Sequence, residues 1–386
     1  MKKTLIAATL CGSLTMAAHA QSSVTLYGLI DTGIVYTNNQ LGHSNWQLGS
    51  SSTQNTVFGL KGSEDLGAGL HAIFKLEQGF LLNNGAQAFG GSAFGSQAWV
   101  GLQSDSYGTL TFGRQFDVMN DLVGPISASF NTWGGSLAAH PFENDNLAAN
   151  SVVINNSVKY VSPVYQGITF ETMYSFSNKA GDFANNRSYG FGLAYTQGPL
   201  NLAAGYLQLN NPGNGAGAVT TGDTSANFVA QRQRIWSLGG NYTFGPATVG
   251  LLWSHTQIDN VAGVFSFGTG TYLGAAGDPT GTLGGSLRLD NYEINTKYAL
   301  TPALSVSGSY TYTHGAYNGS SPDWNTAMLQ TDYAVSKRTD FYLEGVYQNA
   351  HGAPADSVLS HAMINTLSPS STNKQVAVTV GMRHAF

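Results

Sequence analysis

Apolar and polar residues alternate with a period of two along many segments of this chain, and this pattern limits the possible folds more than any other feature. One segment shows it cleanly, with large apolar side chains separated by serine and threonine: Leu304, Ser305, Val306, Ser307, Ser309, Tyr310, Thr311, Tyr312 and Thr313. Segments 24–37, 339–348 and 375–386 repeat it. Because successive side chains of a strand point to opposite faces, each segment predicts a strand with one apolar and one polar face. Several of these runs reach the roughly 9–11 residues that a tilted strand needs to cross a bilayer.

The connections between these segments alternate in length. Short ones are expected at 64–67, 104–108, 163–167, 197–199, 245–246, 301–302 and 336–338. Longer ones are expected at 38–53, 81–94, 115–150, 178–186, 211–230, 259–286, 317–322 and 351–373. This arrangement predicts sixteen strands, with both chain ends on the side of the short turns. Short turns on one side and long loops on the other are typical of transmembrane β-barrels.

Composition supports the same class. Only 10% of the residues are charged, well under the roughly 25% of soluble domains, and the chain holds 48 glycines, 19 tyrosines and 19 phenylalanines. After the first twenty residues no apolar run approaches the ~20 residues of a membrane helix. The net charge of −5 argues against nucleic acid as a partner, since phosphate binding needs a basic face.

The first twenty residues have the pattern of a secretory signal peptide. Lys2 and Lys3 precede a largely apolar run that ends at Ala18-His19-Ala20, a small-x-small cleavage motif. The mature chain is expected to begin at Gln21, so that 1–20 is the signal peptide and 21–386 a single barrel domain. Cleavage would also remove Cys11, the only cysteine, so neither a disulfide nor thiol chemistry is expected.

The last segment favours a closed barrel. As an unpaired edge, the apolar strand 375–386 would promote aggregation, whereas pairing with 24–37 would satisfy its backbone. A barrel of about sixteen strands encloses a water-filled lumen. Aromatic residues gather near the short turns and predict a girdle at one membrane interface: Tyr107, Tyr165, Tyr195, Phe244, Tyr298, Tyr333, Phe341 and Phe386.

The strict alternation stops at 115–150, a connection long enough to be functional. It contains four acids and no lysine or arginine. We expect it to fold into the barrel and narrow the lumen. Its aromatic residues Phe130, Trp133 and Phe142 could stack sugars, but packing of the loop on the wall is the favoured interpretation.

Several short motifs resemble the Gram-negative trimeric general porins, in particular the branch found in Neisseria and Burkholderia. The similar motifs are Ser23-Val-Thr-Leu-Tyr-Gly28 with Asp31, Gly59-Leu-Lys-Gly-Ser-Glu-Asp-Leu-Gly67, Leu110-Thr-Phe-Gly-Arg-Gln115, Asn155-Asn-Ser-Val-Lys-Tyr160, and Gly381-Met-Arg-His-Ala-Phe386. They occur in order along the whole mature chain.

This resemblance implies a sixteen-stranded antiparallel transmembrane β-barrel, a homotrimer and an inward-folded third outside loop. It implies residence in the Gram-negative outer membrane, in contact with lipid and lipopolysaccharide. It also implies that the barrel assembly machinery reads the C-terminal Phe386. The expected cargo is ions and small hydrophilic solutes, and no cofactor or metal is expected.

Selectivity in such a pore depends on charges at the constriction. The candidates on the loop are Asp117, Asp121, Glu143 and Asp145. On the wall, alternation directs Lys61, Lys75 and Glu77 inward, while Arg114 lies at a strand end. Lys61 could instead pair with Glu64 or Asp65. Because acids outnumber bases, and because two positions that are often arginine in the branch are Val57 and Val153, we expect weak cation preference or little selectivity.

Other functions remain as alternatives. The sequence has no G-x-S-x-G, H-E-x-x-H or P-loop motif, so an outer-membrane hydrolase has no motif support. The long loops at 211–230 and 259–286 could serve an adhesin. A channel that prefers one substrate is a further alternative.

Overall fold

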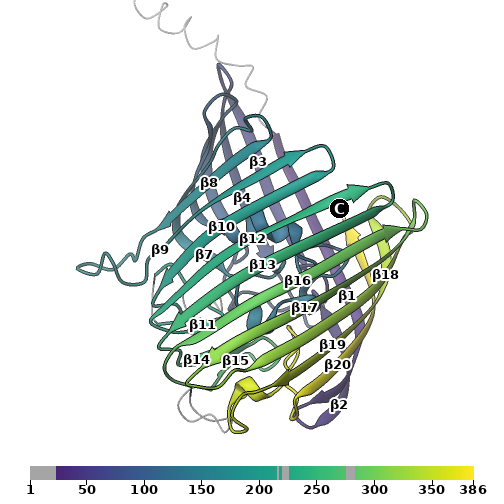
Figure 1. The fold of residues 1–386 in the computed structure, drawn as a ribbon. Helices are drawn as coiled ribbons and strands as arrows, with labels where there is room; N and C mark the ends of the chain where they lie inside the picture. The colour runs from purple at the N-terminus through teal and green to yellow at the C-terminus, as the bar shows by residue number, and fades with distance from the viewer. Residues whose placement is uncertain (1–22, 215–216, 220–225, 275–282) are drawn as a thin grey trace, which may run out of the picture.

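The structure is a computed structural model that describes residues 23–214, 217–219, 226–274 and 283–386. These residues form a closed antiparallel β-barrel with one long segment folded into its interior (Figure 1). The proposed signal peptide at 1–20 and the cleavage site before Gln21 lie outside the described residues. No helix of the described part of the chain is long and apolar enough to span a membrane.

Sixteen strands form the ring, which confirms the predicted fold class. The wall strands are β1 (Ser23–Gln40), β3 (Val57–Gly67), β4 (Leu70–Gly79), β5 (Gln97–Ser104), β6 (Gly108–Phe116), β7 (Val153–Val161), β8 (Ile168–Ser175), β9 (Ser188–Gln197), β10 (Leu200–Asn210), β12 (Arg232–Phe244), β13 (Ala247–Asp259), β16 (Leu287–Ala299), β17 (Leu304–Tyr317), β18 (Asp323–Ala334), β19 (Thr339–His351) and β20 (Lys374–Ala385). Each pairs with its neighbours in the ring, and β1 pairs with both β3 and β20. Closure therefore leaves no open edge in the ring formed by these sixteen strands.

The first long connection differs from the expectation. Instead of a loop at 38–53, β1 continues to Gln40, turns at Leu41-Gly42 and returns as β2 (His43–Ser50). The ring of Trp46 packs 4.9 Å from that of Tyr36 across this hairpin. An aromatic pair across two strands stabilises their pairing, so the hairpin extends beyond the predicted strand end.

The other irregular parts lie mostly at the loop end. Three short strands, β11 (Phe228–Val229), β14 (Gly263–Ser266) and β15 (Thr271–Leu273), pair into a small sheet within two of the predicted loops. The short helical turns are η1 (Met119–Val123), η2 (Gly124–Ile126), η3 (Ser136–Ala138), η4 (Pro141–Glu143) and η5 (Val358–Ser360). At the opposite end, the first short turn lies at Ala68-Gly69, just after the predicted 64–67.

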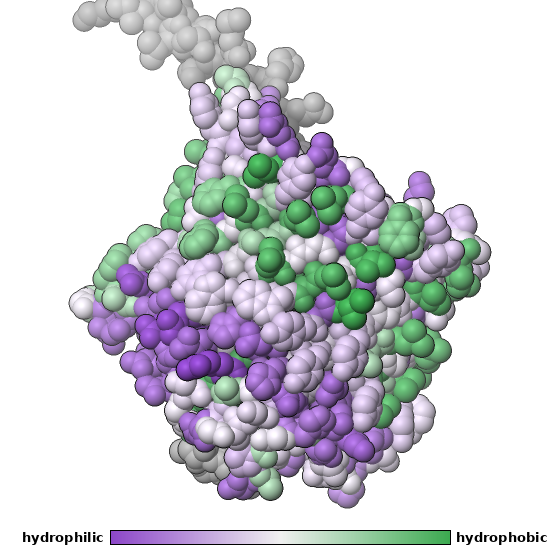
Figure 2. Space-filling view, in the orientation of Figure 1, coloured by the Kyte–Doolittle hydropathy of each residue, from purple (hydrophilic) through white to green (hydrophobic). Residues whose placement is uncertain are grey.

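The wall has the predicted two faces. Along β16, Leu289, Asn291 and Glu293 are buried inside, whereas Tyr292 and Ile294 are exposed outside. Figure 2 shows apolar residues gathered on the outer wall toward the short-turn end and hydrophilic residues on the wall nearer the loops. Aromatic residues of the predicted girdle are exposed outward next to the short turns, at Tyr107, Tyr165, Phe244, Tyr298, Tyr333, Phe341 and Phe386. The outer surface therefore matches a barrel that faces lipid.

Candidate functional site: the loop inside the barrel

The segment that follows β6 enters the barrel and lies against the inner wall, as predicted. Its first turns, η1 and η2, pack on β9, β10, β12 and β13, and η3 packs on β18. Met119 and Val123 are fully buried against Leu207 and Ile235. Apolar side chains on the inner wall would otherwise face water, so covering them is one reason why the loop folds inward.

Glycines on β9 and β10 let the loop come close to the wall. A Cβ atom on Gly205 would lie 2.8 Å from Sδ of Met119. One on Gly190 would lie 2.9 Å from Cγ2 of Val118, and one on Gly192 would lie 2.9 Å from Cδ1 of Leu122. These three glycines therefore form a shallow groove that receives the first turn of the loop.

A buried polar cluster fixes the middle of the loop to the wall. Glu293 of β16 accepts hydrogen bonds from the backbone N–H of Ala128 at 2.7 Å and from Oγ of Ser127 at 2.8 Å. Its Oε2 atom also lies 2.9 Å from Nε2 of His140, whose Nδ1 atom lies 2.6 Å from Oδ2 of Asp145. Burial alone would lower the pKa of His140, but the two flanking carboxylates raise it to about 10. The protonated imidazole thus joins loop and wall between two negative charges.

The opposite side of the loop is also held. The backbone N–H of Ser136 donates to the carbonyl of Thr53 at 3.0 Å, and Nε2 of Gln54 donates to the carbonyl of Phe130 at 2.9 Å. Oγ of Ser307, on β17, donates to the carbonyl of Trp133 at 2.6 Å. The loop is therefore fastened at both sides of the lumen and narrows the space between them.

Three of the four predicted loop acids do not face channel water. Asp117, Glu143 and Asp145 are at most 1% exposed. Burial raises the pKa of Asp117 to about 7 and that of Glu143 to about 8, and Asp145 is occupied by His140. The expectation that Asp117, Glu143 and Asp145 line the constriction is therefore wrong, because all three side chains are buried. Sequence alternation carries no information on the direction of side chains in an irregular loop, which is why they were included.

Asp121 is the loop acid that reaches the channel, with its side chain 32% exposed. It forms an ion pair with Lys159 of β7, and Nζ of Lys159 also lies 3.7 Å from Oε1 of Glu171 on β8. Lys159 and Glu171 were not among the lumen-facing residues predicted from the sequence. Both could have been found there, because Val158 and Phe170 point outward and alternation directs their neighbours inward.

The predicted wall residues of β3 and β4 lie together around Tyr27. Nζ of Lys61 lies 5.3 Å from the centre of the Tyr27 ring, and Nζ of Lys75 lies 5.6 Å from it. Lys75 pairs with Glu77 at 3.2 Å, and Glu77 accepts hydrogen bonds from Tyr27 at 2.7 Å and from Ser96. Lys61 is exposed and has no ion pair with Glu64, Asp65 or any other described residue. Lys61 therefore presents an unpaired positive charge to the lumen, whereas the charge of Lys75 is offset by Glu77.

Arg114 is held by a backbone carbonyl and by an amide side chain rather than placed freely in the lumen. Its Nε donates to the carbonyl of Gly95 at 2.6 Å, and Nη1 donates to Oδ1 of Asn155 at 2.5 Å. A second missed basic residue, Arg383 of β20, pairs with Asp332 and Asp340 on the neighbouring inner wall. Phe142 and Trp133 are buried, in agreement with packing rather than sugar stacking.

The charge balance that favoured cations is therefore not supported. Most acids counted in the sequence are buried or paired, while Lys61 remains exposed and unpaired among the described residues. The described residues contain no cluster of histidine, cysteine and acidic side chains that could hold a metal ion.

A closed transmembrane barrel whose lumen is polar and is narrowed by a fastened loop defines a diffusion channel of the outer membrane. The profile of the Gram-negative porin family matches residues 4–353. The chain belongs to this family and resides in the outer membrane of a Gram-negative bacterium.

Relatives and solved structures agree with this assignment. The chain is 33% identical to an outer membrane porin protein of Bordetella pertussis over the full length of both chains, and 28% identical, also over both full lengths, to outer membrane porin protein 32 of Delftia acidovorans. An anion-selective porin from Comamonas acidovorans has a TM-score of 0.73 at 23% identity, covering 95% of this chain and all of that one. A trimer form of OmpT from Vibrio cholerae has a TM-score of 0.65 at 17% identity, covering 95% of this chain and 99% of that one. At these identities the two structures support the fold alone.

Proposed function

We propose that the protein is a passive channel for ions and small hydrophilic solutes, with little ion selectivity. The observation that carries this proposal is a loop fastened across the lumen of a barrel whose inner wall carries both paired and free charges. Asp121 is neutralised by Lys159, and Glu77 by Lys75, which leaves Lys61 as a modest excess of positive charge. Charges close to a narrow path act with little screening, so one or two free groups decide the sign of the preference. No catalytic step is assigned to the barrel.

Purified protein in planar bilayers tests this proposal. We expect ohmic channels in KCl and a reversal potential close to zero under a salt gradient. Proteoliposomes should swell in small neutral sugars and not in large dextrans. A bilayer that stays non-conducting after the protein is added would contradict the proposal. So would a reversal potential near the equilibrium potential of either K⁺ or Cl⁻.

We further propose that the working form is a homotrimer. Related porins support this, since one structural neighbour is described as a trimer form. The outer faces of β1, β3 and β5 carry exposed apolar side chains such as Leu26, Leu60 and Val100, which suit either lipid or a second subunit. Native mass measurement in detergent, before and after heating, distinguishes a trimer from a monomer.

Contacts with lipopolysaccharide are proposed at the loop end of the outer wall. There Arg232 and Arg234 both contact Asp259, and His255 lies 2.8 Å from Asp290, on strands whose other half is apolar. Charged groups at that level suit anionic head groups rather than acyl chains. We also propose that the segment 1–20 directs export and that the barrel assembly machinery recognises Phe386.

A further inference from the structure

A cavity of about 500 Å³ lies on the loop side of the barrel interior. It is formed by β2, the segment 51–56, the segment 81–90, the end of the loop at 150–152, and residues around β14 and 366–367. Its size is in the range of small-molecule sites. None of the described residues that line it carries a charged side chain, in contrast to the lysines and acids elsewhere in the lumen.

Side-chain amides of this cavity have hydrogen-bonding atoms left over. Asn55 donates from Nδ2 to the carbonyl of Ala149, so its Oδ1 remains as an acceptor. Asn150 accepts at Oδ1 from Asn365, so its Nδ2 remains as a donor. Gln47 accepts at Oε1 from two neighbouring amides and keeps Nε2 as a donor. The remaining atoms have no partner among the described residues, and together they offer both donors and acceptors.

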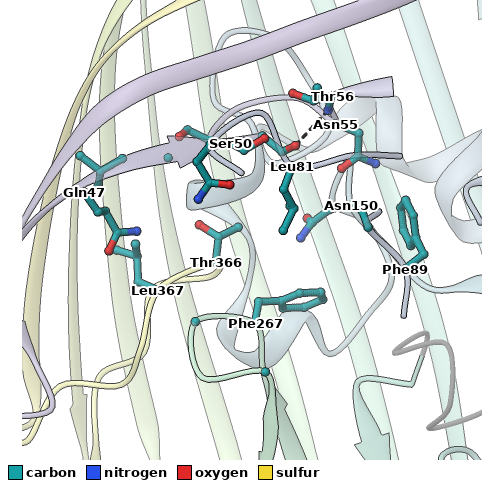
Figure 3. A pocket seen from close by; sticks show the side chains of 18 of the residues that line it. Gln47, Ser50, Asn55, Thr56, Leu81, Phe89, Asn150, Phe267, Thr366 and Leu367 are labelled. Atoms are coloured by element: carbon teal, nitrogen blue, oxygen red, sulfur yellow. Dashed lines mark hydrogen bonds between the residues drawn. The ribbon is translucent and has the colours of Figure 1, made fainter. Parts of the chain in front are cut away.

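Two phenylalanine rings complete the lining. Phe89 has a φ angle of +55°, which is unfavourable for a bulky side chain, and its ring packs directly on Gly79, where a Cβ would lie 2.5 Å from Cε2. Phe267 packs edge-on against Phe265 with ring centres 5.0 Å apart. Figure 3 shows Phe89 and Phe267 beside the same space as Asn150, with Gln47 on its other side. The rings are thus held in position before any solute arrives.

We propose that this cavity is a binding subsite for neutral sugars, from one ring to short oligosaccharides, on their way through the channel. A sugar hydroxyl both donates and accepts hydrogen bonds, as the amides here do. A sugar ring also has a C–H face that packs on an aromatic ring, and the uncharged polar groups of the lining can fix its orientation. An ion gains no Coulomb attraction from a lining without charge. This inference rests on the proposed channel function and names a solute class for it.

Single-channel recording with maltotriose tests the subsite separately from the channel itself. Conductance in KCl alone, measured first, tests the channel and shows that each variant is folded. Maltotriose added to the loop side should then reduce the current in a saturable way with discrete blocking events. A polyethylene glycol of similar size should reduce it only in proportion to its concentration.

The test variants are Phe89→Ala with Phe267→Ala, and Asn150→Ala, and the control is Phe183→Ala in a separate exposed loop. In the double ring variant the maltotriose concentration for half-block should rise about tenfold, equivalent to ~1.4 kcal/mol. Asn150→Ala should raise it by a smaller factor, and the control should match the wild type. If the channels conduct in KCl but block by maltotriose is not saturable, or is the same in all variants, the subsite is refuted. The proposed channel function would still hold in that case.

Discussion

The Nε2 atom of His140 lies 2.9 Å from Oε2 of Glu293, and this contact joins the loop inside the barrel to the wall strand β16. Both side chains are almost fully buried. The other imidazole nitrogen contacts Asp145, so the ring bridges an acid of the loop and an acid of the wall. We therefore expect the width of the channel to depend on a buried group that channel solutes do not touch.

Replacing Glu293 with glutamine should loosen the loop. The change preserves size and some hydrogen bonding but removes one of the two charges beside His140, and breaking a buried pair costs roughly 3–5 kcal/mol at the extreme. We expect a loss of about 1–3 kcal/mol in loop docking, visible as increased open-channel noise in bilayers. Asp182→Asn, in an exposed outside loop, is the control. Equal noise in both variants would show that the cluster does not fix the loop.

Loop docking should weaken as pH rises. The pKa values of His140, Asp117 and Glu143 are raised to about 10, 7 and 8 in the docked loop, above their ordinary values. Each group therefore binds its proton more tightly when docked, so the contribution of these three groups to docking is largest at low pH and is lost as pH rises through the raised values. The two carboxyl contributions fade between about pH 4 and 8, and that of the imidazole between about pH 6.5 and 10.

Current noise recorded from pH 5 to pH 10 tests this direction. We expect noise to grow toward alkaline pH, most steeply near neutrality, where the windows of the three groups overlap, and to grow less in His140→Gln, which has no imidazole to lose its proton. A wild-type channel that is quiet at pH 10 and noisy at pH 5 would contradict the assigned direction.

The sequence predicted the wall of this protein well because lipid outside and water inside impose a simple rule on every strand. The direction of Lys61, Lys75 and Glu77 followed from that rule alone. The same rule would also have found Lys159 and Glu171. The hairpin of β1 and β2 was missed because polar residues such as Asn45 and Gln47 resemble a loop unless their pairing partners are known.

The constriction was less predictable because the loop has no repeating geometry. Asp117 lies just before η1 and Asp121 within it, four residues apart, yet the first is buried and the second is partly exposed to the lumen. The neighbours of these two acids, Val118, Met119 and Leu122, pack on a groove formed by Gly190, Gly192 and Gly205, which lie far along the chain. Burial of a loop acid is thus a tertiary property, and charge counting within the loop could not reveal it.

Filling the groove should displace the loop. In Gly205→Val, the new side chain would overlap with Met119, which is fully buried and has little room to move. Overpacking of this kind costs about 1–3 kcal/mol, and we expect a changed single-channel conductance with the barrel still assembled. Gly345→Val on β19, where nothing lies within 4 Å, is the matched control. Identical conductance in the two variants would mean that the groove does not set the position of the loop.

Lys61 should set the sign of the weak ion preference. Its ammonium group is exposed above Tyr27 and has no ion pair with a described residue, so Lys61→Glu replaces a free positive charge with a negative one. Under a KCl gradient, the reversal potential should move toward the potassium equilibrium potential, since local charge attracts counter-ions. Lys179→Glu, on an outside loop, should have a much smaller effect. If both variants shift equally, general surface charge rather than Lys61 controls the preference.

The C-terminal residue has two separable roles that variants can distinguish. Phe386 exchanges backbone hydrogen bonds of 3.0 and 3.1 Å with Gly28, and a Cβ on Gly28 would overlap with its ring. Phe386→Ala removes the ring needed for both packing and the proposed assembly signal, whereas Gly28→Val keeps the terminal ring but disturbs the site against which the ring packs.

If the assembly machinery reads the ring, Phe386→Ala should lower the folded fraction in cells, measured by heat-modifiable gel mobility, far more than it lowers refolding in detergent. Gly28→Val should reduce the folded fraction in cells and refolding in detergent to a similar degree, because weaker pairing where the two ends of the chain meet affects the barrel in any environment. A Phe386→Ala protein that assembles normally in cells would refute the signal and leave only the packing role.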